Sequence, residues 1–477
     1  MGKNYELEVD LLNDEQKIAA ELAIKYVKGE TDFLSLLISG YAGTGKTYTI
    51  SKIIKYLVGR LHLKVIVTAP TNKAVKILEQ SSDVVHPSIQ YMTCHKMLGL
   101  KPYYDNWGKL KFKQGSGEDD KSPLDKRTVV IVDETSMFPD DLFEFLYPEI
   151  NDAGIKLIFL GDSAQIPPVN KLDCIPFQVH MRERHSIGMT ELTKIVRQAE
   201  TNPILAMATQ IRSNISSTES FRPKKSIIHD GSGIIVLPKA NQEVIRQICD
   251  HYFVNDHFFM NPDFMKVIAW RNEVVNAVND VVRKLIYKRD FLPKIVPSDK
   301  LIADAPVLDP TGLVQGKKWI IINTNDELEV LEAAVKTTRH LGIEINYYET
   351  KVAYVDMEGK NKEKMINIVH EDSEAAFAKI LDSLKKIAVK CPPNEKGWKW
   401  KEYYEMKEHF AEIKYNYAIT AHKAQGSTYD NCMVIDWDLS QNPTVIERNR
   451  IRYVAITRPR KLLFMVHDDR TTGPINR

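Results

Sequence analysis

The sequence predicts an α/β protein with two doubly wound parallel sheets, a small hairpin inserted in the first and a β-rich module inserted in the second. Three observations support this. Short β-branched apolar runs alternate with helix-like stretches over the first 200 residues, and the alternation returns after residue 230. The block 313–413 has a different pattern, which is typical of antiparallel strands. Apolar runs of four to six residues separated by helices are typical of buried parallel strands.

Four apolar runs are the expected strands of the first sheet. Each ends in polar or turn residues: Leu36–Ile38, Lys64–Ala69, Thr128–Val132 and Lys156–Leu160. In a doubly wound sheet the functional edge lies at the carboxyl ends of the strands, so the residues that follow these runs are the candidates for a site.

The second sheet is expected from a later set of runs alternating with helices such as Arg271–Tyr287. These runs are Gly233–Leu237, Lys266–Trp270, Tyr415–Thr420, Cys432–Trp437 and Leu462–Val466. In the inserted module we expect strands at Trp319–Asn323, Glu327–Leu331 and Ile343–Met357. Helices are expected after them, at Ser373–Val389 and Lys399–Phe410. The predicted domains are 1–196, with a hairpin insertion at 96–127, then 197–312 together with 414–477, with the module at 313–413.

Length and composition bound the class of protein. A chain of 477 residues suggests roughly three domains. Lys and Arg number 65 against 63 Asp and Glu, so any nucleic-acid binding must use a local basic groove and not global charge. The five Cys are scattered without a CxxC pair, which argues against a zinc ribbon or a secreted disulfide framework. With no apolar signal core and no membrane-length apolar run, we expect an intracellular protein without a membrane partner.

The most specific motif is Gly40-Tyr-Ala-Gly-Thr-Gly45-Lys46-Thr47, a complete G-x-x-x-x-G-K-[ST] between an apolar strand and a helix. Glycines allow backbone N–H groups to converge on phosphate oxygens. Lys46 is expected at the β- and γ-phosphates, and the Thr47 hydroxyl as a ligand of Mg²⁺. The motif predicts a nucleoside triphosphate site.

An acidic pair ends the run Val129-Val-Ile-Val-Asp133-Glu134. Alone, such a pair is more often a solvated strand end or a helix cap. Beside a complete phosphate loop, Asp133 is expected near the metal and Glu134 is expected to orient or deprotonate the attacking water.

Three further residues are candidates for the hydrolytic site. Gln165, after the next strand, can bond both the γ-phosphate and the water, although a turn with an exposed Gln is an equal alternative. Arg197 and Arg458 have the chemistry of arginine fingers, but any single Arg is most often a surface charge.

Taken together and in order, these blocks resemble superfamily 1B DNA helicases, the RecD-like branch, over nearly the whole chain. The resemblance implies two RecA-like domains and an SH3-like inserted module. It implies that Gln16, in Leu12-Asn-Asp-Glu-Gln, reads the adenine edge, that Gly43, Thr44 and Gly45 belong to the phosphate loop, and that Arg197 and Arg458 act from across the cleft.

The resemblance also implies the residues that contact single-stranded DNA. In the first domain these lie in Ala69-Pro70-Thr71-Asn72-Lys73 and Thr93-Cys94-His95, and in the second in Trp270-Arg-Asn272 and Thr420–Thr428. The candidates are Pro70, Thr71, Asn72, His95, Asn272, Thr420, His422 and Lys423.

Two aromatic groups have alternative roles. In the 96–127 hairpin, Phe112, by resemblance, and Trp107, by its place near the turn, are candidates for a wedge that stacks on the first separated base pair; either could instead anchor the hairpin. In the inserted module, Trp398 and Trp400 lie among lysines, which suits either docking against the hairpin or contact with DNA, and we favour docking.

The expected function is that of an ATP-dependent DNA helicase that uses ATP and Mg²⁺ and moves 5′ to 3′ on single-stranded DNA. The polarity is implied by the resemblance, because Gln165-Ile-Pro-Pro lacks the base-stacking aromatic of 3′-to-5′ relatives. An RNA helicase and an ATP-switched DNA-binding scaffold are the alternatives. Expected partners are single-stranded and forked duplex DNA, with single-strand-binding or replication proteins, around a monomer in the cytoplasm, or the host cytoplasm if a phage encodes it.

Overall fold

The computed structural model describes residues 11–104, 110–115, 122–168, 171–196, 202–218, 225–308, 320–356 and 359–468. The chain forms two compact units. The first holds Met1–Gly99, Glu118–Val278 and Ala418–Arg477, and the second holds Leu100–Gly117 and Asn279–Tyr417. Each is described on its own.

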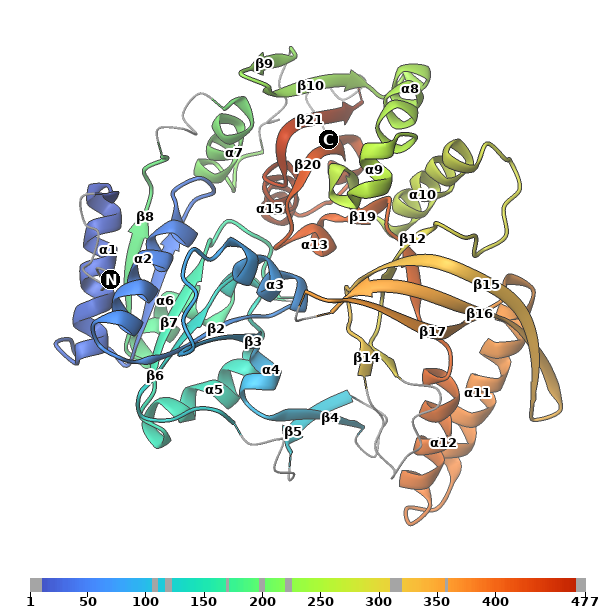
Figure 1. The fold of residues 1–477 in the computed structure, drawn as a ribbon, viewed down its shortest axis with the longest axis horizontal. Coiled ribbons are helices and arrows are strands. Elements are labelled where there is room, and N and C mark those ends of the chain that lie inside the picture. The colour runs from blue at the N-terminus through green and yellow to red at the C-terminus, as the bar shows by residue number, and fades with distance from the viewer. Residues whose placement is uncertain are drawn as a thin grey trace. The chain divides into compact units, whose positions relative to one another are not determined.

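The first unit contains a six-stranded sheet in which every neighbouring pair is parallel (Figure 1). Its spatial order is β3 (Ile89–Thr93), β2 (Lys64–Ala69), β6 (Thr128–Val132), β7 (Lys156–Gly161), β1 (Ser35–Gly40) and β8 (Ile187–Leu192). The covering helices include α1 (Asp14–Lys28), α2 (Lys46–Gly59), α3 (Asn72–Ser81) and α5 (Asp140–Asp152), with the short α4 (Cys94–Met97) and α6 (Val179–Arg184). Strands β1 and β6 are buried along their whole length, which explains their continuous apolar sequence.

A second six-stranded sheet lies in the same unit, and only its edge strand β9 (Ile227–His229) is antiparallel. The order is β19 (Ala418–Thr420), β11 (Met265–Ala269), β20 (Tyr429–Ile435), β21 (Pro459–His467), β10 (Ser232–Pro238) and β9. Its helices are α7 (Pro203–Ser213), α8 (Gln242–Phe253), α9 (Asp256–Met260), α13 (Ala421–Ala424), α14 (Asp436–Leu439) and α15 (Val445–Ile456). Helix α10 (Asn272–Tyr287) belongs to this unit up to Val278 and to the second unit from Asn279 on. Ala164 and Ile166, which follow β7 of the first sheet, belong to the hydrophobic core of the second.

The second unit is built on an antiparallel sheet of five strands. The order is β17 (Asn361–Val369), β16 (Ile343–Val355), β15 (Glu327–His340), β12 (Lys300–Ala303) and β18 (Ile413–Tyr415). Two strand pairs, β13 (Val307–Leu308) with β14 (Ile320–Ile322) and β4 (Leu100–Tyr104) with β5 (Leu110–Gln114), and the helices α11 (Glu374–Lys390) and α12 (Lys396–Glu408) complete it.

The predicted fold class is confirmed: two parallel α/β sheets with an antiparallel module inserted in the second and a hairpin inserted in the first. Several element predictions were wrong in detail. The strand expected to end at Leu331 continues to His340, because β15 and β16 form a long hairpin, and β17 was missed because its first half, Asn361–Lys364, is strongly polar. The run Tyr415–Thr420 is split between β18 and β19, which belong to different sheets.

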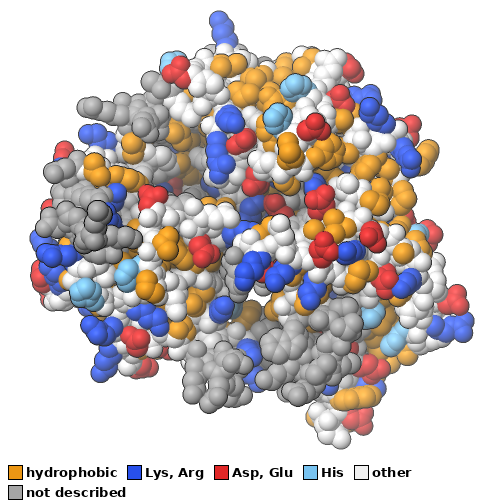
Figure 2. Space-filling model, in the orientation of Figure 1, with side chains coloured by type: hydrophobic (Ala, Val, Ile, Leu, Met, Phe, Trp, Pro, Cys, Tyr) orange, Lys and Arg blue, Asp and Glu red, His pale blue; other side chains and the backbone are white. Residues whose placement is uncertain are grey.

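The distribution of charged side chains agrees with the nearly equal numbers of basic and acidic residues in the sequence. In the face drawn in Figure 2, basic and acidic side chains are interspersed over the surface. All five cysteines are free thiols; Cys94, Cys174, Cys249 and Cys432 are buried, and Cys391 is half-buried. Among the described residues, no helix is both long enough and apolar enough to span a bilayer.

The second unit contains a buried ion pair whose loss can be measured. Arg283 binds Asp299 with both Nε and a terminal nitrogen, at 2.9 and 2.8 Å, and both side chains are at most 5% exposed. Replacing Asp299 with Ala leaves a buried guanidinium without its counter-charge, so the free energy of unfolding should fall by about 3–5 kcal/mol.

Urea denaturation measures this loss, and Arg339→Ala is the matched control. The Arg339–Glu344 pair spans β15 and β16 with both side chains about two-thirds exposed (68% and 66%), so it should contribute at most about 1 kcal/mol. Equal losses in the two variants would show that Asp299 does not stabilise the unit.

Candidate nucleotide-binding active site

The phosphate loop joins β1 to α2, where the sequence motif places it. Gly43 and Gly45 have positive φ angles of 80° and 77°, which side chains with a Cβ rarely adopt. No side chain caps α2, so the first amides of the helix are available to an anion. The Lys46 Nζ donates to the carbonyl oxygens of Gly40 (2.6 Å) and Tyr41 (3.0 Å), which holds the ammonium group over the loop.

Gln16 holds the phosphate loop in place. Its Oε1 accepts the Asn13 backbone N–H and its Nε2 donates to the Thr44 carbonyl oxygen at 2.9 Å, so one buried side chain caps α1 and holds the loop. Its predicted role at the adenine stays a prediction.

Glu15, beside it, was not predicted. Its carboxylate accepts the Thr193 hydroxyl and the backbone N–H groups of Thr193 and Lys194 at 2.6–2.8 Å. Burial opposes the charged form, but these hydrogen bonds outweigh it and lower the pKa of Glu15. Arg197, which follows shortly after this segment, lies outside the described residues.

The acidic pair lies at the carboxyl end of β6. Burial, and next the Glu134 carboxylate, raise the pKa of Asp133 to about 7, against the opposing effects of the Glu134 N–H and of Lys46. Glu134 has a left-handed backbone (φ 50°), and its Cγ would lie 3.9 Å from a Cβ built at Gly426 of the second sheet. The two carboxylates and Lys46 therefore lie close enough to act on one another electrostatically, and paired carboxylates suit a bound cation.

Gln165 lies in a turn, but it is not exposed, and its side chain bonds groups beside both sheets. Its Oε1 accepts hydrogen bonds from Ser136 Oγ (3.3 Å) and from Gln425 Nε2 (3.0 Å). Gln425 is buried and also reaches the Ile166 carbonyl oxygen (3.3 Å). Because the oxygen end of the Gln165 amide is occupied, its NH₂ end is the one left to bond an anion.

Arg458 follows α15 and is 6% exposed. Its guanidinium donates to the carbonyl oxygens of Val454 (2.9 Å) and Ser427 (3.0 Å) and to the Thr457 hydroxyl (2.9 Å). These three partners are uncharged, so the positive charge is held in place and not neutralised. That differs from the surface charge which is the usual role of an Arg.

The predicted DNA-contact blocks follow strands in both sheets. Thr71, Thr93 and Thr420 are the N-caps of α3, α4 and α13, and their hydroxyls accept the N–H groups of Ala74, Lys96 and Lys423. Burial lowers the pKa of His95 and of His422, which favours neutral rings. Pro70 and Asn72 flank Thr71 at the end of β2, and Asn272 begins α10 after β11.

Asp438 is a positioning residue that the sequence did not reveal. Its fully buried carboxylate accepts the backbone N–H groups of Trp270 and Arg271 and the Arg271 Nε, at 2.6–2.9 Å. It thereby fixes the turn that leads to Asn272. The signal was the short motif Asp436-Trp-Asp438 after an apolar run, which can be read as a solvated strand end.

The hairpin candidates are only partly described. Phe112 is half-buried in the middle of β5, where it pairs with Pro102, so it does not lie in the turn. Trp107 lies outside the described residues. In α12, Trp398 is 64% exposed, whereas Trp400 is buried and stacks on Tyr404, so the two tryptophans have different environments.

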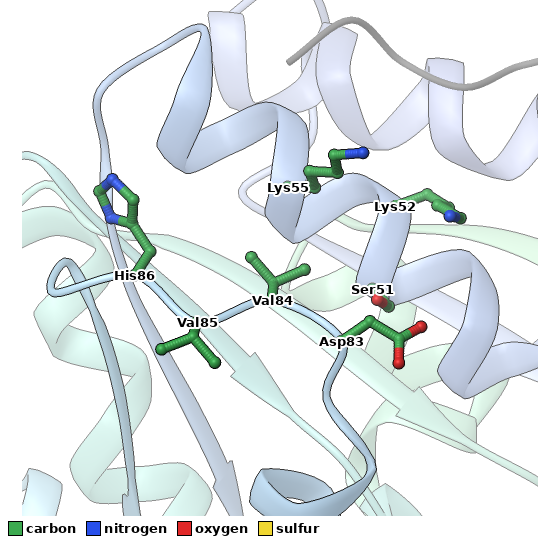
Figure 3. Close-up of a pocket in the computed structure, with 7 residues that line it drawn as sticks. All are labelled: Ser51, Lys52, Lys55, Asp83, Val84, Val85 and His86. Atoms are coloured by element: carbon green, nitrogen blue, oxygen red, sulfur yellow. The ribbon is translucent and has the colours of Figure 1, made fainter. Parts of the chain in front are cut away.

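A shallow pocket elsewhere in the unit is not the predicted site. It lies between α2 and the loop before β3 (Figure 3) and is lined by Ser51, Lys52, Lys55, Asp83, Val84, Val85 and His86. None of the predicted nucleotide or DNA residues is among them.

Comparison with known proteins agrees with these motifs. Residues 11–232 match the family model described as an AAA domain, and residues 415–466 match the UvrD-like helicase C-terminal domain. The ATP-dependent DNA helicase dda of Enterobacteria phage T4 is 28% identical over 96% of this chain and 99% of its own length. The RecD subunit of the RecBCD enzyme of Buchnera aphidicola is 24% identical over 90% of this chain and 69% of its own.

Among solved structures, Pif1 helicase from Candida albicans aligns with a TM-score of 0.45 and 16% identity, over 95% of both chains. The two matching family models, together with dda, which aligns over nearly its full length, and RecD, support the class of superfamily 1B helicases for this chain. Within that class it is related to dda of phage T4.

Gly45 offers a test of the phosphate loop. A Cβ at this position would lie 2.6 Å from Gln16 Nε2 and would force that amide off the Thr44 carbonyl oxygen. Gly45→Ala should therefore weaken binding of a fluorescent ATP analogue at least about tenfold, which corresponds to 1.4 kcal/mol.

Gly29→Ala is the matched control, because Gly29 has the same φ (78°) but no atom within 4 Å of a built Cβ. Both variants should lose about 1 kcal/mol of stability from backbone strain, and only Gly45→Ala should lose affinity. Unchanged affinity in Gly45→Ala would contradict the assignment of the loop.

Proposed function

We propose that this protein is an ATP-dependent DNA helicase that moves 5′ to 3′ on single-stranded DNA and separates duplex DNA ahead of it. The observation that carries the proposal is the hydrogen bond between Gln165 and Gln425 at 3.0 Å. It joins the residue expected to sense the γ-phosphate to the block expected to contact the DNA strand. The family and the relatedness to dda support the same activity.

In the proposed reaction the first sheet binds the triphosphate. The loop amides of Gly43, Thr44 and Gly45 bind phosphate oxygens, and Lys46 exchanges its carbonyl partners for the β- and γ-phosphates. Glu134 orients the attacking water and takes its proton, and the Gln165 NH₂ group bonds the γ-phosphate. Gln16 contacts the adenine from its position under the loop.

Mg²⁺ fits the donor set of this site. The Thr47 hydroxyl and the Asp133 carboxylate are hard oxygen donors. Burial, and next the Glu134 carboxylate, raise the pKa of Asp133, and a bound cation would favour its charged form. When bound, the ion screens phosphate charge. In the described part of the chain no group of three or more His, Cys, Asp or Glu is placed to hold a metal ion, so phosphate and water oxygens would supply the remaining ligands.

The two arginines act on the transferring phosphoryl group. Arg458 has only uncharged partners, so its charge is available to the equatorial oxygens, and Arg197 is proposed to act with it. Because Arg458 belongs to the second sheet, ATP draws the two sheets together and hydrolysis releases them.

The DNA strand is proposed to lie along the carboxyl ends of the strands in both sheets. Pro70, Thr71, Asn72 and His95 contact it from the first, and Asn272, Thr420, His422 and Lys423 from the second. Neutral histidines and threonine hydroxyls suit hydrogen bonds to the phosphate backbone, so binding should be independent of sequence. The proposed contact of the Lys423 ammonium with a phosphate should make binding weaker in high salt. Alternating grip by the two sheets then moves the strand.

The remaining parts of the proposal rest on the family resemblance. We take from the resemblance the domain boundaries at 196, 312 and 413 and the 5′-to-3′ polarity. Wedge roles for Phe112 and Trp107 rest on it too. So do a monomeric state in the cytoplasm, forked duplex DNA as a substrate, and single-strand-binding or replication proteins as partners.

Unwinding of fluorescent duplexes that carry only a 5′ tail or only a 3′ tail, with ATP and Mg²⁺, tests activity and polarity together. We expect separation of the 5′-tailed duplex alone and stronger stimulation of ATP hydrolysis by poly(dT) than by poly(U). Stronger stimulation by poly(U) would identify an RNA helicase, and tight DNA binding without turnover would identify a nucleotide-switched scaffold.

Glu134 provides the prediction specific to the chemistry. Glu134→Gln keeps the side-chain size and removes the base, so ATP hydrolysis stimulated by poly(dT) should fall by about 10²–10⁴-fold while binding of ATP and DNA persists. Glu144→Gln, an exposed change on α5, is the control and should leave turnover unchanged. Normal turnover in Glu134→Gln would remove Glu134 from the mechanism.

A further inference from the structure

Tyr453, on helix α15 of the second sheet, bonds the phosphate loop that follows β1 of the first sheet. The Tyr453 hydroxyl on α15 donates to the Asp162 Oδ2 at 2.5 Å and accepts the backbone N–H of Ala42 at 3.1 Å. Tyr453 is 1% exposed and Asp162 is fully buried. One hydroxyl therefore joins α15, the end of β7 and the phosphate loop, three segments far apart in the sequence.

Asp162 organises a small network around this hydroxyl. Its Oδ1 accepts the Arg212 Nε (2.9 Å) and the Ala164 N–H (3.0 Å), and its backbone oxygen accepts the Gln165 N–H (3.1 Å). The Arg212 guanidinium lies 3.3 Å from the centre of the Tyr41 ring. The neighbouring loop residues Tyr41 and Ala42 are thus both held by groups bonded to Asp162, which also begins the turn that carries Gln165.

The chemistry of Tyr453 is that of a permanent donor. Burial, and next the charge of Asp162, raise the pKa of the Tyr453 hydroxyl well above its usual value. The phenol stays protonated, so it donates to the carboxylate and leaves a lone pair for Ala42.

The same helix end carries Arg458. The Arg458 Nε bonds the Val454 carbonyl oxygen, one residue after Tyr453, and the buried pair of Arg452 with Asp436 (2.6 Å) holds the helix in its sheet. Only the short segment from Tyr453 to Arg458, held in place by these bonds, therefore separates the Ala42 contact from the guanidinium. Where Tyr453 rests on the loop determines where Arg458 stands with respect to it.

We propose that Tyr453 is a positioning residue for ATP hydrolysis: its hydroxyl, bonded to Asp162 and Ala42, sets the register between the phosphate loop and Arg458. The inference rests on the proposed function, because it requires ATP in the loop and Arg458 on the transferring phosphoryl group. Interactions made only in the transition state affect kcat and leave KM nearly unchanged. Loss of the hydroxyl should act in this way.

The test is Tyr453→Phe, which removes one oxygen and keeps the ring. With saturating poly(dT), kcat for ATP hydrolysis should fall on the order of tenfold, with the KM for ATP changed less than about twofold. Tyr26→Phe is the matched control. Tyr26 is equally buried, donates to the Leu34 carbonyl oxygen (2.8 Å) and accepts the Leu157 N–H (2.9 Å), away from the loop.

Both variants should lose similar thermal stability, and only Tyr453→Phe should lose turnover. Should Tyr453→Phe fail to fold, Asp162→Asn takes its place, because it keeps the side-chain shape and removes the charged acceptor. Turnover that matches Tyr26→Phe, or a loss confined to KM, would overturn the proposal.

A double variant tests whether Tyr453 acts through Arg458. Tyr453→Phe combined with Arg458→Ala should lose no more turnover than Arg458→Ala alone, since residues that act as a unit are not additive. Multiplied losses would overturn the positioning role. Failure of the proposed function is distinguishable, because the unmodified protein would then show no ATP hydrolysis stimulated by single-stranded DNA.

Discussion

The proposed mechanism depends on polar groups that are buried between the two parallel sheets and hydrogen-bonded there. A buried amide, carboxylate or guanidinium must be hydrogen-bonded, and each of Gln425, Asp162, Tyr453 and Arg458 is. Exchanging one such partner for a phosphate or a water changes the free energy little, whereas separating an apolar interface of equal area is costly. A polar junction is therefore less costly to open than an apolar one of equal area.

The short helix α14 adds a mechanical connection on the second sheet. Asp436 holds Arg452 of the helix that precedes Arg458, and Asp438 holds the turn of Trp270 and Arg271 that leads to Asn272. Two buried carboxylates on one helical turn thus support both the arginine expected at the nucleotide and a loop expected at the DNA. Neither carboxylate can lose its partners without leaving a buried charge, so this helical turn ties the two segments to each other.

The sequence predicted those parts of the molecule whose signals are local. The strands Lys64–Ala69 and Thr128–Val132 and the phosphate loop follow from continuous apolar runs and one motif, and the structure has them at the predicted residues. The length of β15 could not be predicted, because its second half is exposed and has no apolar pattern. Gln425 and Asp162 were not predicted as a junction, since their partners lie 260 and 291 residues away in the chain and only the fold brings them together. The family resemblance supplied what spacing could not, namely roles for Gln16 and Arg458.

The burial of the thiols makes the molecule convenient for spectroscopy. Burial raises the pKa of Cys94 and Cys249 to about 12 and keeps them, with Cys174 and Cys432, from reacting as thiolates, whereas Cys391 at the end of α11 is half-buried. A maleimide dye therefore attaches first to Cys391, in the antiparallel unit and remote in sequence from the nucleotide motifs. Cys391 is thus the preferred labelling position among the five cysteines.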